Sequence, residues 1–273
     1  MRGINDRFIN DLTSGCLSSF LTRVINDNKL SLQIRGNYIN IYYRGGSALR
    51  IEQKRDRYSF KFDENYCLNE KTRTKVKAFK GLDDYRENFS LLLSEMDGWF
   101  RVNQRQEREL QQELLVHNRQ DFCILDIEYT GAYTDGKGSR KRPRLDMIAA
   151  YNRKLVIVEN KFGEGSIGGG AGLAKHYEDI CDIIDNDDAR NALTRSMENI
   201  SKNKKALGLP TVDIKSTDIK KEDIEILFIA FNYNKKSKMI NQQLDGIDRR
   251  YPAKILYMDH AGKIPYQNAQ ILK

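Results

Sequence analysis

The spacing of apolar residues changes twice within the first quarter of the chain. Between residues 4 and 27 they recur every three or four positions, which is typical of an amphipathic helix. After residue 30 they alternate, or nearly alternate, with polar residues in four short segments separated by glycine-containing or charged turns. The four segments cover residues 30–34, 38–43, 49–51 and 58–62. This pattern predicts a small antiparallel meander that follows a helix.

A polar and basic stretch follows the meander. Residues 63–84 lack periodicity, so we place a domain boundary within them. The sequence therefore predicts a small α+β accessory domain over residues 1–82 and a second domain over residues 83–273.

The second domain combines helical spacing with continuous apolar runs. From residue 85 helical spacing returns and extends, with a bend near Gly98, to residue 117. Two later helices are expected at about 171–184 and 188–206, and two later strands at 224–231 and 253–258. These strands are apolar along most of their length, as in a sheet that is covered on both faces. We therefore expect an α/β domain.

One segment of this domain predicts a hairpin that aligns two acidic residues. Two apolar strands flank the polar pair at 152–153. If that pair is a two-residue loop, Tyr151 pairs with Lys154. Counting outward by one residue on each strand then brings Asp146 opposite Glu159. Directly opposed side chains have Cβ atoms roughly 4.5–5.5 Å apart.

This alignment favours a site for a divalent cation. Two opposed carboxylates repel each other unless they share a cation. Lys161 lies two positions beyond Glu159, so alternation along a strand puts both on one face. Hard cations such as Mg²⁺ prefer oxygen ligands and retain waters, and a nearby lysine can steady an attacking hydroxide. The alternative is a structural salt bridge of Glu159 with Lys161 or Arg144, which a bare Glu-x-Lys triplet would favour.

The surrounding pattern resembles the core motif of the PD-(D/E)XK nuclease superfamily. In this chain Asp146 is followed by the hairpin and by an apolar strand that ends in Glu159-Asn160-Lys161. Upstream, the segment Glu107-Arg108-Glu109-Leu110 resembles the first-helix motif of that superfamily, and of archaeal Holliday junction resolvases in particular. The resemblance covers roughly residues 100–185. A proline that often precedes the aspartate is absent, because Leu145 occupies its place.

The resemblance implies a fold and a set of roles. The fold is a restriction endonuclease-like core, with a mixed central sheet flanked by helices. Asp146 and Glu159, together with the backbone carbonyl of Asn160, would bind Mg²⁺, for which Mn²⁺ could substitute. Lys161 would serve the nucleophile, and Glu107 would complete the cluster.

Two acidic residues compete for the last position in this cluster. At 100° per residue Glu107 falls on the stripe that Phe100, Leu110 and Leu114 share, so it faces the core unless it reaches water at the margin of the stripe. Glu128, after an expected strand at 123–127, is the second candidate. Some families place a glutamate at the corresponding position, but we rank Glu128 below Glu107 on geometry.

Basic residues near the motif predict contacts with phosphates. The loop at 130–144 runs directly into the strand of Asp146, and it contains Lys137, Arg140, Lys141, Arg142 and Arg144. A glycine-rich segment at 163–172 matches no nucleotide-binding motif and reads as a loop. Beyond it, Lys175 or His176 could contact phosphate, as residues near this point do in the resembling families. The simpler alternatives are a solvated basic loop and an ordinary surface histidine.

Composition narrows the class of protein. The net charge of +8 and the isoelectric point near 9.1 fit a polyanionic partner. No apolar run approaches the ~20 residues that a membrane helix requires, and the N-terminus lacks the pattern of a signal peptide, so we expect a cytoplasmic protein. Four scattered cysteines without a Cys-x-x-Cys pair, and only three histidines, argue against structural zinc and disulfides.

Taken together, the sequence predicts a metal-dependent nuclease that hydrolyses phosphodiester bonds, with DNA as the favoured substrate and endonuclease action as the favoured mode. The alternative from another class is a non-catalytic nucleic-acid-binding protein that retains the nuclease fold. A homodimer would suit the cutting of two strands, although no residue demands one.

Overall fold

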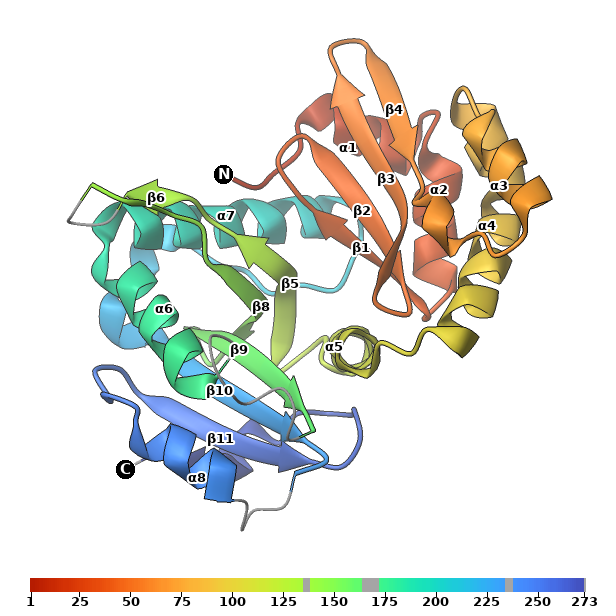
Figure 1. Cartoon of the computed structure of the whole chain (residues 1–273). Helices are drawn as coiled ribbons and strands as arrows, with labels where there is room; N and C mark the ends of the chain where they lie inside the picture. Colours follow the sequence, from red (N-terminus) through yellow and green to blue (C-terminus); the bar gives the residue numbers. More distant parts are fainter. Residues whose placement is uncertain (135–137, 164–171, 234–237, 273) are drawn as a thin grey trace. The chain divides into compact units, whose positions relative to one another are not determined.

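The computed structural model describes residues 1–134, 138–163, 172–233 and 238–272 (Figure 1). The chain divides into two compact units. The N-terminal unit comprises residues 2–112 and 203–209, and the C-terminal unit comprises residues 113–202 and 210–273 together with Met1. This division falls after Gln112, whereas the sequence analysis places a boundary after residue 82.

The N-terminal unit contains the predicted meander. Its four strands form one antiparallel sheet in the order β1-β2-β3-β4, so this prediction is confirmed. The strands are β1 (Leu30–Ile34), β2 (Tyr38–Tyr43), β3 (Gly46–Lys54) and β4 (Arg57–Lys61). The helices of this unit are α1 (Asp6–Thr13), α2 (Ser18–Asn26), η1 (Glu64–Tyr66), α3 (Glu70–Lys77), α4 (Leu82–Val102) and the first half of α5 (Gln106–His117).

Alternation along the strands explains the core of this unit. Leu32 pairs with Ile41 on the buried face of the sheet. Aromatic rings from the sheet and the helices complete that core, with Phe60 stacked on Tyr85 at 5.5 Å.

Two predictions about helices are wrong. The single helix expected over residues 4–27 is two helices, because the chain turns at residues 14–17. The continuous helix expected to residue 117 is also interrupted, since α4 ends at Val102 and α5 begins at Gln106. The break lies beyond Gly98, where we expected only a bend. The segment 63–84, which shows no apolar periodicity, contains η1, α3 and the start of α4.

The C-terminal unit contains a six-stranded mixed sheet in the order β12-β11-β10-β9-β8-β5. Strands β9, β10 and β11 run parallel, while β5–β8, β8–β9 and β11–β12 pair antiparallel. The mixed sheet flanked by helices is therefore confirmed. Its strands are β5 (Cys123–Thr130), β8 (Arg144–Tyr151), β9 (Lys154–Phe162), β10 (Ile224–Phe231), β11 (Ala253–Met258) and β12 (Gln270–Ile271).

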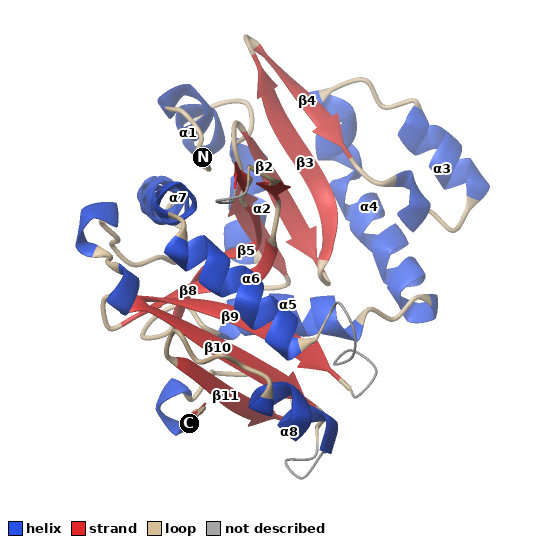
Figure 2. Ribbon diagram, turned by 60° about the vertical axis from the view of Figure 1, so that its left-hand side comes forward, coloured by secondary structure: helices blue, strands red, loops and turns tan. Residues whose placement is uncertain are grey.

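Helix α6 lies across one face of this sheet (Figure 2). All eight residues of β10 are buried, as expected for a strand that is apolar along most of its length. No helix in the described part of the chain combines the length and the apolar character that crossing a bilayer requires. The remaining elements are α6 (Leu173–Asp185), α7 (Asp187–Ala206), α8 (Lys238–Asp245), β6 (Tyr133–Thr134), β7 (Arg140–Lys141), and the short helices η4 (Ser216–Asp218), η5 (Lys221–Asp223) and η6 (Tyr266–Asn268).

The β8–β9 hairpin turns where the sequence predicts. Asn152 and Arg153 have φ angles of 48° and 66°, so both central residues adopt the left-handed conformation that a type I′ turn requires. Asparagine tolerates this conformation better than most residues do. The register confirms the pairing of Tyr151 with Lys154 and continues outward to Met147 and Val158.

Candidate active site

The two predicted carboxylates meet one position beyond the last backbone pair of the hairpin. There the pairing between the two backbones ends, and hydrogen bonds from backbone N–H groups to side-chain carboxylates join the strands instead. Asp146 Oδ2 accepts a hydrogen bond from the backbone N–H of Asn160 at 3.1 Å. Glu159 Oε1 accepts one from the backbone N–H of Asp146 at 3.3 Å. Each carboxylate therefore bonds to the opposite strand, and these bonds hold the two acidic side chains at a common level.

These groups are buried rather than exposed at the surface. Asp146 is 9% exposed, Glu159 is 1% exposed and Lys161 is 5% exposed. A buried charge costs free energy unless it is paired or coordinates a metal. Burying three ionisable groups at one end of a strand pair therefore lowers the free energy of unfolding unless a bound ion compensates for it.

The structural salt bridge that the sequence left open is not formed among the described residues. Lys161 has no ion pair within 4.0 Å there, and Arg144 lies 3.9 Å from Glu128 rather than near Glu159. Lys161 shares the face of Glu159, one two-residue step along β9. The amine and the carboxylates are thus neighbours that do not neutralise one another by direct contact.

The protonation of Glu159 follows from this environment. Burial raises the pKa of Glu159 well above its ordinary value, and the negative charge of Asp146 raises it further. The positive charge of Lys161 lowers it, but does not outweigh the other two effects. Glu159 therefore retains a proton to a higher pH than an exposed glutamate unless additional positive charge is supplied.

The donor chemistry fits a hard divalent cation. Glu159 Oε2 is buried and accepts no hydrogen bond from the described residues, so this oxygen has a lone pair that a cation could use. Asp146 and Glu159 would hold the cation, and the carbonyl of Asn160 stays a predicted third ligand. Among the described residues no group of three or more histidine, cysteine or acidic side chains gathers as a metal site. Waters and substrate oxygens would have to complete the coordination.

The two other candidate acids, Glu107 and Glu128, lie in different units of the chain. Glu107 is half-buried on α5 in the N-terminal unit, so its membership of the cluster stays a prediction. The stripe that it was expected to share with Phe100 is interrupted, since the two residues lie on separate helices. Glu128 lies in the same unit as the carboxylates, and the β5–β8 register places it at the level of Asp146. Its φ of 50° interrupts the alternation of β5.

A further buried acid was not singled out from the sequence. Asp126 is fully buried on β5 and pairs with Ile148, so it shares the face of Asp146 as a diagonal neighbour. Its Oδ1 accepts the backbone N–H of Ile127 at 2.9 Å. An aspartate inside an otherwise apolar strand was the available signal in the sequence.

The basic loop before β8 is more ordered than its composition suggested. Strands β6 and β7 pair as a short antiparallel ribbon, where the sequence predicts a basic loop. Asn186 Nδ2 donates to the carbonyl of Thr134 at 3.0 Å and ties the ribbon to the end of α6. Arg140, Arg142 and Arg144 are exposed on it or beside it, whereas Lys137 and residues 164–171 of the glycine-rich segment lie outside the described residues.

The two predicted contact residues of α6 have separate environments. Lys175 is exposed, and its Nζ lies 2.6 Å from Asp179 on the surface of the same helix. His176 instead faces the carboxylates, with its Nδ1 3.4 Å from Glu159 Oε2. The structure thus brings His176, but not the Lys175 ammonium, into contact with the predicted cluster.

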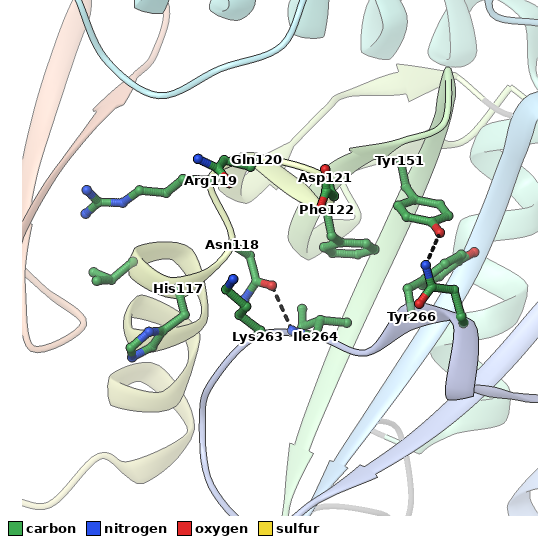
Figure 3. A pocket seen from close by; sticks show the side chains of 12 residues that line it. His117, Asn118, Arg119, Gln120, Asp121, Phe122, Tyr151, Lys263, Ile264 and Tyr266 are labelled. Atoms are coloured by element: carbon green, nitrogen blue, oxygen red, sulfur yellow. Dashed lines mark hydrogen bonds between the residues drawn. The ribbon is translucent and has the colours of Figure 1, made fainter.

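A surface pocket of about 380 Å³ lies at the other end of the hairpin (Figure 3). Tyr151 lines it and is five positions from Asp146 along β8, which corresponds to about 17 Å. Its wall is formed by Phe122, Tyr151 and Tyr266, whose rings pack on one another with centroids 4.7–6.1 Å apart. The Asn118 side chain is engaged with the backbone, since its Oδ1 accepts the N–H of Ile264 at 2.8 Å. The pocket contains none of the predicted site residues.

The site thus consists of Asp146, Glu159 and Lys161 at the rim of the sheet, with His176 above them on α6. Comparisons of the chain with protein-family models, with curated proteins and with solved structures found no match. The functional interpretation therefore depends on the residues and their geometry.

Proposed function

We propose that this protein is a metal-dependent nuclease with a restriction endonuclease-like core, and that it hydrolyses phosphodiester bonds in DNA. The observation that carries the proposal is the buried pair Asp146 and Glu159, with Lys161 beside it and no internal counter-ion within 4.0 Å of that lysine among the described residues. Such a group is expensive in a folded core, and a bound cation with a phosphate would neutralise it.

Each residue has a role in this proposal. The Asp146 and Glu159 carboxylates bind Mg²⁺, and their bonds to the opposite strand fix their orientation. When bound, the ion orients a water and offsets negative charge on the phosphate. Lys161 Nζ donates hydrogen bonds to the attacking oxygen or to the phosphoryl oxygens, where negative charge increases in the transition state. Glu128 is the acid of the same unit that we favour for supporting this cluster.

Cleavage assays test the proposal directly. Supercoiled plasmid, single-stranded DNA and branched DNA are each incubated with the protein and Mg²⁺ or Mn²⁺, and in parallel with EDTA. We expect metal-dependent cleavage of at least one substrate. Asp146→Asn and Lys161→Ala should each lower the rate by about 100-fold or more, because each removes a group that stabilises the transition state.

Exposed residues of the same unit provide matched controls. Asp218→Asn and Lys215→Ala make the same chemical changes at exposed positions and should leave cleavage unchanged. Equal nicking by the wild type and by both site variants would point to a contaminating nuclease and would refute the assignment. Binding of DNA without cleavage would favour the non-catalytic alternative.

Arg142 and Arg144, which follow the β6–β7 ribbon in the chain, give a separate prediction for binding. In the variant Arg142→Gln with Arg144→Gln, we expect weaker DNA affinity and a shallower dependence of affinity on salt. Each lost phosphate contact should reduce the slope of log K against log salt by about 0.9 on duplex DNA. Fluorescence anisotropy between 50 and 200 mM salt, about the range over which such slopes are measured, gives both quantities.

The hairpin turn offers the control for this measurement. Arg153→Gln removes one exposed arginine at the far end of β8 and should leave the slope unchanged. An unchanged slope for the ribbon variant, or the same change for Arg153→Gln, would contradict a role of the ribbon in phosphate contact.

A further inference from the structure

The imidazole of His176 approaches the cluster from a fixed helix. The neighbouring residue Tyr177 is buried, and its hydroxyl donates to the carbonyl of Tyr251 at 3.0 Å and accepts the N–H of Tyr251 at 2.8 Å. The backbone N–H of His176 donates to the carbonyl of Gly172 at 3.1 Å, which closes the first turn of α6. The start of the helix is therefore anchored where the imidazole meets the sheet.

The contact involves the one oxygen of Glu159 that is otherwise unused. Oε1 is occupied by the backbone of Asp146 at 3.3 Å, whereas Oε2 accepts no hydrogen bond from the described residues. Within the part of the chain that the structure describes, His176 is the one basic side chain within 4.0 Å of this carboxylate. Its Nδ1 lies 3.4 Å from Oε2, a few tenths of an ångström beyond an ordinary N–H···O bond.

The position of the ring suits a hydrogen-bond donor. An imidazole can carry hydrogen at Nδ1, and the carboxylate oxygen beside this atom favours the form in which it does.

We propose that His176 is a positioning residue for Glu159: its Nδ1 lies 3.4 Å from Oε2, where a small shift closes an N–H···O hydrogen bond that orients the carboxylate for a divalent cation. The inference rests on the proposed function, and it assigns His176 a role other than the phosphate contact expected from the sequence. Groups that orient metal ligands typically affect metal affinity by 10–100-fold, roughly, when they are removed.

Metal binding without DNA tests this role. Mn²⁺ and Mg²⁺ titrations followed by calorimetry compare the wild type with His176→Asn, His176→Leu and His176→Gln. The asparagine amide places an N–H near the position of Nδ1, leucine has no donor, and glutamine moves the amide by one bond. We expect the leucine and glutamine variants to bind both ions about 10-fold to 100-fold more weakly, and the asparagine variant to retain most of the affinity.

The same titrations separate the inference from the function on which it rests. Glu178→Gln, at an exposed position of α6, is the control and should bind as the wild type does. Full affinity in both the leucine and the glutamine variants, with metal binding intact in the wild type, would overturn the inference and leave the nuclease proposal standing. A loss of Mn²⁺ binding alone, with Mg²⁺ unaffected, would show that His176 is itself a ligand and would also overturn it. No metal binding by the wild type would refute the nuclease proposal itself.

Discussion

Replacing Glu159 with glutamine is expected to abolish metal-dependent cleavage and to stabilise the folded protein at the same time. Glutamine keeps the size of the side chain but removes a charge that is almost completely buried beside Asp146. Loss of a cation ligand should lower the cleavage rate by about 100-fold or more. Removal of the repulsion should raise the free energy of unfolding, since each unit by which burial raises a pKa costs about 1.4 kcal/mol at high pH.

The pH dependence of this gain follows from the direction of the shift. The pKa of Glu159 is raised in the folded state, so the folded wild type binds more protons than the unfolded chain between the ordinary value of 4.5 and the raised value. Its stability therefore falls as pH rises through that interval. The advantage of Glu159→Gln should be absent below the ordinary value and should increase above it.

Urea denaturation in EDTA across this pH range measures the gain. Glu222→Gln, at an exposed position of the same unit, is the matched control and should show no such trend. Saturating Mg²⁺ should reverse the order of stability, because it binds the folded wild type and not the variant. A variant less stable than the wild type in EDTA at pH 8 would show that the carboxylate is stabilised by contacts other than those described.

The second large effect is expected at Glu225, at the start of β10 and away from the site. Glu225→Gln should lower the free energy of unfolding by about 1–3 kcal/mol, because it removes a buried charge that accepts hydrogen bonds from two lysines and a tyrosine hydroxyl. Lys154 Nζ lies 2.5 Å from Glu225, Lys254 Nζ lies 3.0 Å from it, and the Tyr266 hydroxyl donates to it. These contacts tie β9, β10, β11 and η6 together.

The pH dependence of Glu225 has the opposite sign to that of Glu159. Burial raises the pKa of Glu225, but the hydrogen bonds from Lys154, Tyr266 and Lys254 outweigh it and bring the pKa to about 2. A lowered pKa contributes stability that is present above the ordinary value of 4.5 and is lost as pH falls towards 2. Denaturation curves should therefore show the penalty of Glu225→Gln at pH 7 and little of it near pH 2, where the Glu225 carboxyl of the wild type takes up a proton. A constant penalty over that range would show that packing, and not charge, sets the effect.

The hairpin at the centre of the site could be predicted because its determinants are local. A two-residue turn fixes the register, and alternation fixes the face, so Asp146, Glu159 and Lys161 could be placed from residue numbers alone. The strands β10 and β11 were found with the same limits because runs of that length, apolar at most positions, fit a covered sheet.

The sequence did not show where the helix before residue 117 is interrupted, or to which unit the first half of α5 belongs. The apolar spacing of α4 and α5 allows one helix, but the chain breaks at residues 103–105. The first half of α5 instead docks on the meander, where Gln112 Oε1 accepts the N–H of Gly45 at 2.6 Å and Arg44 pairs with Glu109 at 2.8 Å. Such contacts join residues that are more than sixty positions apart, so periodicity carries no information about them.

The sequence by itself determined the meander, the hairpin register and the candidate acids, because each depends on neighbours within a few residues or on a single turn. Only the tertiary structure decided that Lys161 lacks an ion pair among the described residues, that Glu159 is buried with a raised pKa, and that His176 reaches its free oxygen. Burial and electrostatics depend on which elements pack together. That choice is made by contacts between distant segments, whose free energies no local pattern contains.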